Sequence, residues 1–258
     1  MTQFINDFPI FLLILVRVSS FFITVPLFSY RNIPSTHKIG LAALMSYLMF
    51  FTIDKPDIAI DGLYIMLVLK EVMVGLLIGL VAYMVTTAIQ IAGGFIDFQM
   101  GFAIANVIDP QTGVQSPIMG QYLYTFAMLL LLILNAHHLI LDGIFYSYRL
   151  IPVDQLTIPF GEENIVRFIT KMFSTVFLIA FQMAVPVVGC LFLVDVALGI
   201  VARTVPQLNI FVVGLPLKIL VSFLVLVLVM PIFMMLIQDL FVMMLKTMRG
   251  LMELIGGV

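Results

Sequence analysis

Charged residues are scarce in this chain. Of its 258 residues, 10% are charged and 63% are hydrophobic, whereas an ordinary soluble domain carries about 25% charged residues. Cysteine occurs once, and a single thiol at Cys190 excludes a disulfide within the chain. The formal net charge of −2 offers no basic surface for nucleic acid. The composition therefore indicates an integral membrane protein, or a subunit buried in an apolar assembly.

Motifs of catalytic and cofactor-binding sites are also missing. The sequence contains no GxxxxGK[ST], GxSxG or HExxH pattern. His137 and His138 are adjacent, but neighbouring side chains on a helix point about 100° apart, and no nearby Cys or His completes a zinc site. We therefore expect no enzyme activity, no metal and no cofactor. The first residues lack the basic region and cleavage site of a signal peptide, so we expect an uncleaved anchor there.

Long apolar runs dominate the chain. They lie at about 8–30, 39–53, 62–92, 118–141, 165–201 and 208–245. The last two have 37 and 38 residues and would measure roughly 55 Å as unbroken helices, well beyond a hydrocarbon core of about 30 Å. Pro186 and Pro231 are expected to kink or break them. Because the runs lack the alternation of a β-barrel, we predict an all-α, membrane-associated fold of long, partly broken helices.

The basic residues fit poorly with six successive membrane crossings. With the amino terminus outside, Arg31, Lys38 and Arg203 fall inside, but Lys246 and Arg249 fall outside. Loops on the inner side normally carry the excess of Lys and Arg. Either one segment does not cross, or the helices pack in a larger assembly where the bilayer does not dictate each one. We favour the second explanation.

Several ionisable residues lie inside the apolar runs: Arg17, Glu71, Asp195, Lys218 and Asp239. Charges at membrane depth are costly and need partners or water. They indicate either a proton or ion pathway, for which Asp195 is the one good candidate, or buried ion pairs between helices or subunits, which we favour. A hairpin at 202–207 would leave Asp195 and Lys218 about one helical turn out of register, roughly 6 Å, and a lysine side chain can span that distance. The spacing therefore predicts an Asp195–Lys218 ion pair.

The stretch GGFIDFQMGFAIANVIDPQTG, residues 93–113, is glycine-rich, apolar and acidic at once. Gly93, Gly94 and Gly101 allow the backbone to bend or to approach other chains closely. Asp109 and Pro110 favour a stop and a turn. We therefore expect the preceding helix to end at about residue 92 and this stretch to form a loop.

Irregular backbone at membrane depth is tolerated only where it is buried in protein or lines a cavity. The bulky side chains of the stretch are Phe95, Phe98, Met100, Phe102 and Ile104. Two interpretations fit equally well: a compliant apolar seal in a pore, since hydrophobic constrictions gate by dewetting, or a tightly packed turn between helices. The acids Asp97 and Asp109 fit helix capping, pairing with another subunit, or contact with water in a channel.

Three stretches resemble a known family. They read GGFIDFQMGFAIANVIDPQTGVQSP, LNAHHLILDG and LFLVDVALGIVARTVPQLNIFVVGLPLK. They are similar to the FliR family of flagellar type III export, most of all to its Bacillus type, and virulence type III secretion systems carry relatives of it. The resemblance covers nearly the whole chain. It implies a FliP-like helical part over residues 1–160 and a FliQ-like helical hairpin over residues 161–258.

The resemblance also implies a function. The family is a core subunit of the export gate in the flagellar basal body, a multi-pass protein of the bacterial inner membrane surrounded by lipid. One copy is expected to assemble with FliP and FliQ, beside FlhB and FlhA, around a channel for unfolded flagellar subunits. The loop 93–113 would plug this channel through Gly93, Gly94, Phe95, Phe98, Met100, Gly101, Phe102, Ile104, Asp109 and Pro110.

Three alternatives remain. In the first, the chain belongs to a virulence secretion system rather than to a flagellum. It would otherwise be a secondary transporter that uses Asp195 and Lys218 for ion coupling, or a membrane scaffold without a pore.

Overall fold

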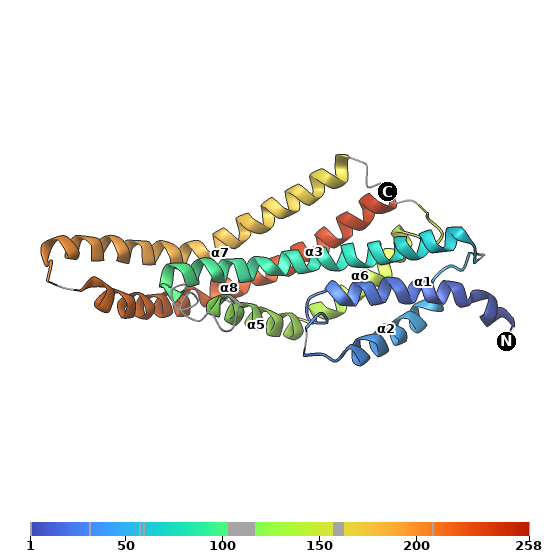
Figure 1. Cartoon of the computed structure of the whole chain (residues 1–258), viewed down its shortest axis with the longest axis horizontal. Coiled ribbons are helices and arrows are strands. Elements are labelled where there is room, and N and C mark those ends of the chain that lie inside the picture. The colour runs from blue at the N-terminus through green and yellow to red at the C-terminus, as the bar shows by residue number, and fades with distance from the viewer. Residues whose placement is uncertain are drawn as a thin grey trace. The chain divides into compact units, whose positions relative to one another are not determined.

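A computed structural model describes residues 2–30, 32–56, 58, 60–102, 117–156, 163–207 and 209–257. These residues form α-helices joined by short connections, with no strand among them (Figure 1). The helices are α1 (Thr2–Thr24), α2 (Ser35–Phe50), α3 (Gly62–Met100), α5 (Ile118–Ile133), α6 (Ala136–Leu150), α7 (Glu163–Thr204) and α8 (Ile210–Gly256). The predicted all-α fold is confirmed.

Four helices are long and apolar enough to cross a membrane: Asp7–Thr24 within α1, all of α3, all of α7, and Phe211–Gly256 within α8. The pair α5 and α6 would add a fifth span, although the two helices meet at a bend of 75°. Asn135 lies at this bend and has a φ of 56°. The chain is therefore a multi-pass membrane protein, and the apolar run predicted at 118–141 is divided between two helices.

The two longest helices continue through their prolines. Pro186 lies inside the 42 residues of α7, and Pro216 and Pro231 lie inside the 47 residues of α8. A proline inside a helix costs about 3 kcal/mol, but ending a helix in apolar surroundings leaves several backbone groups without a hydrogen bond. Helices α7 and α8 are therefore not interrupted at Pro186 and Pro231, and the sharp bend of 75° lies between α5 and α6 instead.

The chain folds as two compact units, each made of segments that are distant in sequence. The first unit comprises Met1–Val85, Leu132–Met172 and Val242–Val258, and the second comprises Thr86–Leu131 and Phe173–Phe241. Each has its own apolar core, with Leu13, Ile14 and Phe21 fully buried in the first and Ile89, Ile96 and Leu123 in the second. The division at residue 160, which rests on the family resemblance, stays a prediction.

Candidate functional site

The glycine-rich stretch begins as a helix and not as a loop. Helix α3 continues to Met100, eight residues beyond the predicted end at residue 92. It stops at Gly101, whose φ of 90° is a conformation that side-chain-bearing residues rarely adopt. Thus the predicted loop boundary is wrong for Gly93 to Met100, while Ile104, Asp109 and Pro110 lie outside the described residues.

Gly93 is needed for close packing between α3 and α5. A Cβ atom built on Gly93 would overlap the backbone of Gly120 and lie 2.9 Å from the carbonyl carbon of Met119. A Cβ on Gly120 would in turn lie 2.9 Å from the carbonyl oxygen of Gln90. At Gly94 the nearest atom is Cγ of Pro117 at 4.0 Å, so that position has room. Of the two glycines, Gly93 therefore allows the close contact between α3 and α5, and Gly94 is not needed for it.

Asp97 caps helix α5 from the side of α3. Its side chain is 3% exposed, and its carboxylate accepts hydrogen bonds from the backbone N–H of Met119 at 2.9 Å and of Gly120 at 3.3 Å. The first N–H groups of a helix have no partner inside the helix, so an acidic side chain there both satisfies them and complements the helix dipole. Of the roles left open for Asp97, the structure shows capping.

The bulky side chains of the predicted plug point in different directions. Met100 is fully buried within the chain, whereas Phe98 is 73% exposed. Phe95 packs edge-on against Phe177 and Phe181 of α7, with ring centroids 6.0 and 6.1 Å away. Phe102, just after the end of α3, is partly exposed. On the described part of the stretch, Phe98 is thus the apolar side chain most available to a channel or to another chain.

A polar cluster joins the end of α3 to both long helices. Lys218 of α8 forms an ion pair with Asp195 of α7, and Gln99 of α3 donates a hydrogen bond to the other carboxylate oxygen of Asp195 at 2.8 Å. The ion pair is partly accessible, with the side chains 22% and 35% exposed. Gln99 was not singled out by the sequence, because it lies 96 residues from Asp195. Asp195, the candidate proton carrier, is therefore engaged by two neighbours.

A second polar cluster is completely buried and holds the first unit together. Arg17 of α1 forms an ion pair with Glu71 of α3, and both side chains are 0% exposed. The Arg17 guanidinium also donates to Glu71 Oε1 at 2.9 Å, to Ser147 Oγ at 3.1 Å and to the carbonyl of Ile151 at 3.0 Å. It stacks on Tyr148, with Cζ 3.8 Å from the ring centroid. Arg17 thus connects α1 and α3 with α6 and the residue that follows it.

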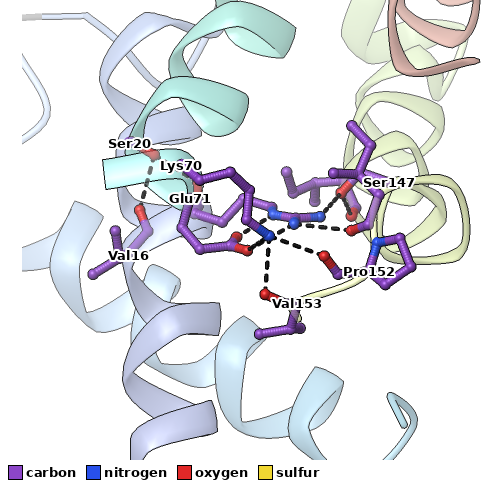
Figure 2. Close-up of polar contacts among 10 residues, drawn as sticks. Val16, Ser20, Lys70, Glu71, Ser147, Pro152 and Val153 are labelled. Atoms are coloured by element: carbon purple, nitrogen blue, oxygen red, sulfur yellow. Dashed lines mark hydrogen bonds and ion pairs between the residues drawn. The ribbon is translucent and has the colours of Figure 1, made fainter. Parts of the chain in front are cut away.

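Lys70 adds a second cation to this cluster. Its Nζ lies 2.6 Å from Glu71 Oε1 and donates to the carbonyls of Pro152 and Val153 at 2.9 and 3.0 Å (Figure 2). One carboxylate therefore faces two cations, and the carbonyl oxygens and Ser147 accept the remaining hydrogen bonds. Buried charges at membrane depth need such partners, so the cluster supports the ion-pair interpretation of Arg17 and Glu71. Only Glu71 was predicted from the sequence at this point of the apolar run, although Lys70 directly precedes it.

Helices α1 and α3 approach each other closely beside the buried cluster. Gly75 and Gly79 form a GxxxG pattern, which is typical of closely packed membrane helices. A Cβ on either residue would overlap α1, with Ser20 and the Arg17 carbonyl at Gly75, and with Thr24 at Gly79. The small residues therefore bring the two backbones near enough for the Arg17 and Glu71 side chains to meet.

The histidine pair lies at the bend between α5 and α6. The rings of His137 and His138 lie with their centroids 4.1 Å apart and their planes tilted by 38°. Among the residues that the structure describes, no group of three or more His, Cys, Asp or Glu side chains could hold a metal ion. The histidines are thus part of the bend, and the two polar clusters and the end of α3 are the features that carry chemistry.

Comparison with known proteins gives a consistent result. Residues 8–244 match the family described as bacterial export proteins, family 1. The chain is 56% identical over 257 residues to the flagellar biosynthetic protein FliR of Bacillus subtilis (strain 168), and the match covers 99% of each chain. It is 28% identical over 223 residues to FliR of Escherichia coli (strain K12), covering 84% of this chain and 83% of that one.

A relative with a different name is about as similar to this chain as FliR of Escherichia coli. The Yop proteins translocation protein T of Yersinia pestis is 30% identical over 219 residues, covering 84% of each chain. The family match extends over most of the chain and includes most of α1, the whole of α3 and α7, and most of α8. The chain therefore belongs to the FliR family, family 1 of the bacterial export proteins.

Proposed function

We propose that this chain is a core subunit of the flagellar type III protein export gate, in the basal body within the bacterial inner membrane. The observation that carries this proposal is the identity of 56% over 99% of both chains with a flagellar relative. The Yersinia pestis relative is 30% identical and FliR of Escherichia coli is 28% identical. It is therefore the much higher identity to the flagellar protein of Bacillus subtilis that favours the flagellar system over the virulence alternative.

FliP and FliQ are the proposed partners in the gate, with FlhB and FlhA beside them. Support comes from the surface of the two longest helices. The most apolar window of α7 and that of α8 are each only 17% buried within the chain. A 47-residue helix such as α8 measures about 70 Å, more than twice the hydrocarbon thickness of about 30 Å. Lipid alone cannot cover such a helix, so further protein chains are needed around it.

Within this gate, residues 93–113 are proposed to contribute the plug. The end of α3 supports the proposal because Phe98 is 73% exposed there. Gly101 ends the helix next to Leu215, whose Cδ1 lies 2.8 Å from the position of a Cβ on Gly101. The polar cluster of Gln99, Asp195 and Lys218 fixes this end of α3 against both long helices. The end of α3 is therefore held by side-chain contacts with α7 and α8.

Complementation tests the export function. In a Bacillus subtilis strain that lacks its own FliR, this chain is expected to restore swimming and the release of filament subunits into the medium. The Yersinia Yop translocation protein T, expressed to the same level, serves as the virulence-type control and is expected to restore neither. If this chain reaches the membrane at the normal level but exports no filament subunit, the proposed function is wrong.

The plug requires a separate test. Deletion of residues 95–104 would also remove the Asp97 cap on α5, so a side-chain variant is cleaner. The double substitution Phe98→Ala and Phe102→Ala is expected to make cells leak ions and small solutes, because less apolar bulk remains to keep the channel dry. Phe173→Ala, at a phenylalanine of α7 that is 63% exposed, is the matched control. Normal assembly without any leak would contradict the plug.

A further inference from the structure

Four of the five ionisable residues named from the sequence inside the apolar runs have a partner within the chain. Arg17 pairs with Glu71, and Asp195 pairs with Lys218. The fifth, Asp239 of α8, is exposed. Among the described residues it makes neither an ion pair nor a hydrogen bond. The next basic residue along α8, Lys246, lies seven residues further on, about 10 Å along the helix.

Asp239 lies at the end of an exposed apolar stripe. Leu228, Ile232 and Met235 are 77%, 52% and 66% exposed. With Asp239 they follow the spacing of three and four residues that places side chains on one helix face. On another face of the same helix, Phe233, Ile237 and Leu240 are at most 2% exposed and form part of the core. The stripe therefore faces away from its own chain.

Whatever covers this stripe also covers the carboxylate. A surface that buries Met235 extends over Asp239, which is one helical turn away, and removes water from it. Burying a charge without a partner is strongly unfavourable. Helix α8 has 47 residues and is longer than the hydrocarbon thickness, so lipid covers only part of it. In the proposed gate, protein covers the stripe.

A carboxylate that protein covers needs hydrogen-bond donors, as Asp97 has at the start of α5. Along the middle of a helix the backbone N–H groups are already used within the helix, so a Lys or Arg side chain is the donor that also balances the charge.

We infer that the stripe of Leu228, Ile232, Met235 and Asp239 docks an apolar helix of another subunit, and that a Lys or Arg of that helix pairs with Asp239. The inference rests on the proposed function, in which this chain is one subunit of a larger gate, and it specifies the chemistry of the neighbour of α8. A second copy of this chain fits less well, since a two-fold contact through the stripe would bring two Asp239 carboxylates together.

Charge reversal in the complete assembly tests the inference. Asp239→Lys is expected to lower the amount of assembled gate recovered from membranes on the order of 30-fold, since losing a partner of a buried charge pair has effects of this size. Asp239→Asn, which keeps the shape, is expected to have a smaller effect, and Asp239→Glu almost none. Glu253→Lys is the control, because Glu253 is an accessible carboxylate beside Arg249 near the end of α8.

Suppressor selection then identifies the partner. In cells carrying Asp239→Lys, selection for restored swimming is expected to yield Lys or Arg changed to a neutral or acidic residue in an apolar helix of another subunit. Assembly of Asp239→Lys at the wild-type level, or suppressors confined to Lys246 of this chain, would overturn the inference, because Asp239 would then face water or its own helix. In that outcome a wild-type chain that restores export leaves the proposed function standing. If the wild-type chain neither assembles nor restores export, both proposals fail.

Discussion

Two adjacent glycines in α3 should respond in opposite ways to the same substitution. Gly93 touches the backbone of Gly120, so a methyl group there has no room unless α5 moves away. Gly94 has its nearest neighbour, Pro117 Cγ, at 4.0 Å from the position of a new Cβ, which is an ordinary van der Waals contact. Gly93→Ala should therefore destabilise the protein, and Gly94→Ala should stabilise it.

The size of the difference follows from known helix energetics. Alanine favours a helix interior over glycine by about 0.5–1 kcal/mol, and Gly94→Ala should gain this amount. Gly93→Ala gains the same helix preference but overpacks the contact with α5, which costs about 1–3 kcal/mol and more where backbone must move. The two variants should therefore differ by about 1–3 kcal/mol in the free energy of unfolding. For a chain of this size, this corresponds to a separation of roughly 2–12 °C in Tm.

Heating of the membrane-extracted assembly measures this difference. A fluorescent protein fused to the chain reports, by gel filtration, how much assembly survives at each temperature. We expect survival to fall in the order Gly94→Ala, wild type and Gly93→Ala. Equal midpoints for the two variants, or a lower midpoint for Gly94→Ala, would refute the close contact between α3 and α5.

The remaining substitutions probe the polar contacts by the same heating assay. Glu71→Gln leaves two buried cations without their carboxylate and should lower the free energy of unfolding by about 3–5 kcal/mol. The control Glu163→Gln removes one partner of an ion pair whose side chains are 74% and 76% exposed, and it should change the free energy of unfolding little. Similar losses in both variants would contradict the buried cluster. Asp97→Ala removes the cap of α5 and should cost about 1–2 kcal/mol, with Asp97→Asn losing less; a harmless Asp97→Ala would argue against capping. Asp195→Ala and Lys218→Ala should be non-additive, the double variant being about as stable as either single one; additive losses would argue against the pair.

The Asp195–Lys218 contact is one that chain order and helix geometry can predict from the sequence. A short hairpin between two long helices fixes which residues lie at equal height, and the rise per residue then limits the possible partners. The spacing therefore led to two residues that the structure brings together. Gln99 reaches the same carboxylate from a helix 96 residues away, and no local pattern encodes that contact.

The end of α3 shows where local preference misleads. Two consecutive glycines weaken a helix by about 1 kcal/mol each, so a break after residue 92 was the reasonable expectation. The contact of Gly93 with Gly120 and the cap that Asp97 provides for α5 both require the helix to continue. Tertiary packing therefore outweighs helix propensity at this point, and no single-sequence pattern reports it.

The buried Arg17–Glu71 pair lies between these two cases. Charges inside apolar runs need partners, which predicts that each of these two residues is paired, and the structure pairs them with each other. Their separation of 54 residues cannot be converted into a contact without knowing that α1 and α3 are neighbours. The GxxxG pattern at Gly75 and Gly79 indicates a close helix contact but does not name the other helix.

Crosslinking to cargo in transit tests most directly that exported polypeptide passes along this chain. In a Cys190→Ser background, which removes the exposed native thiol, Phe98→Cys places a reactive group at the exposed end of α3, and Tyr47→Cys places one on α2, where Tyr47 is 49% exposed. A filament subunit fused to a tightly folded domain would stall during export. We predict that the stalled subunit crosslinks to the Phe98→Cys variant and not to the Tyr47→Cys variant. Equal crosslinking to both variants, or none to Phe98→Cys in an export-competent assembly, would contradict the channel.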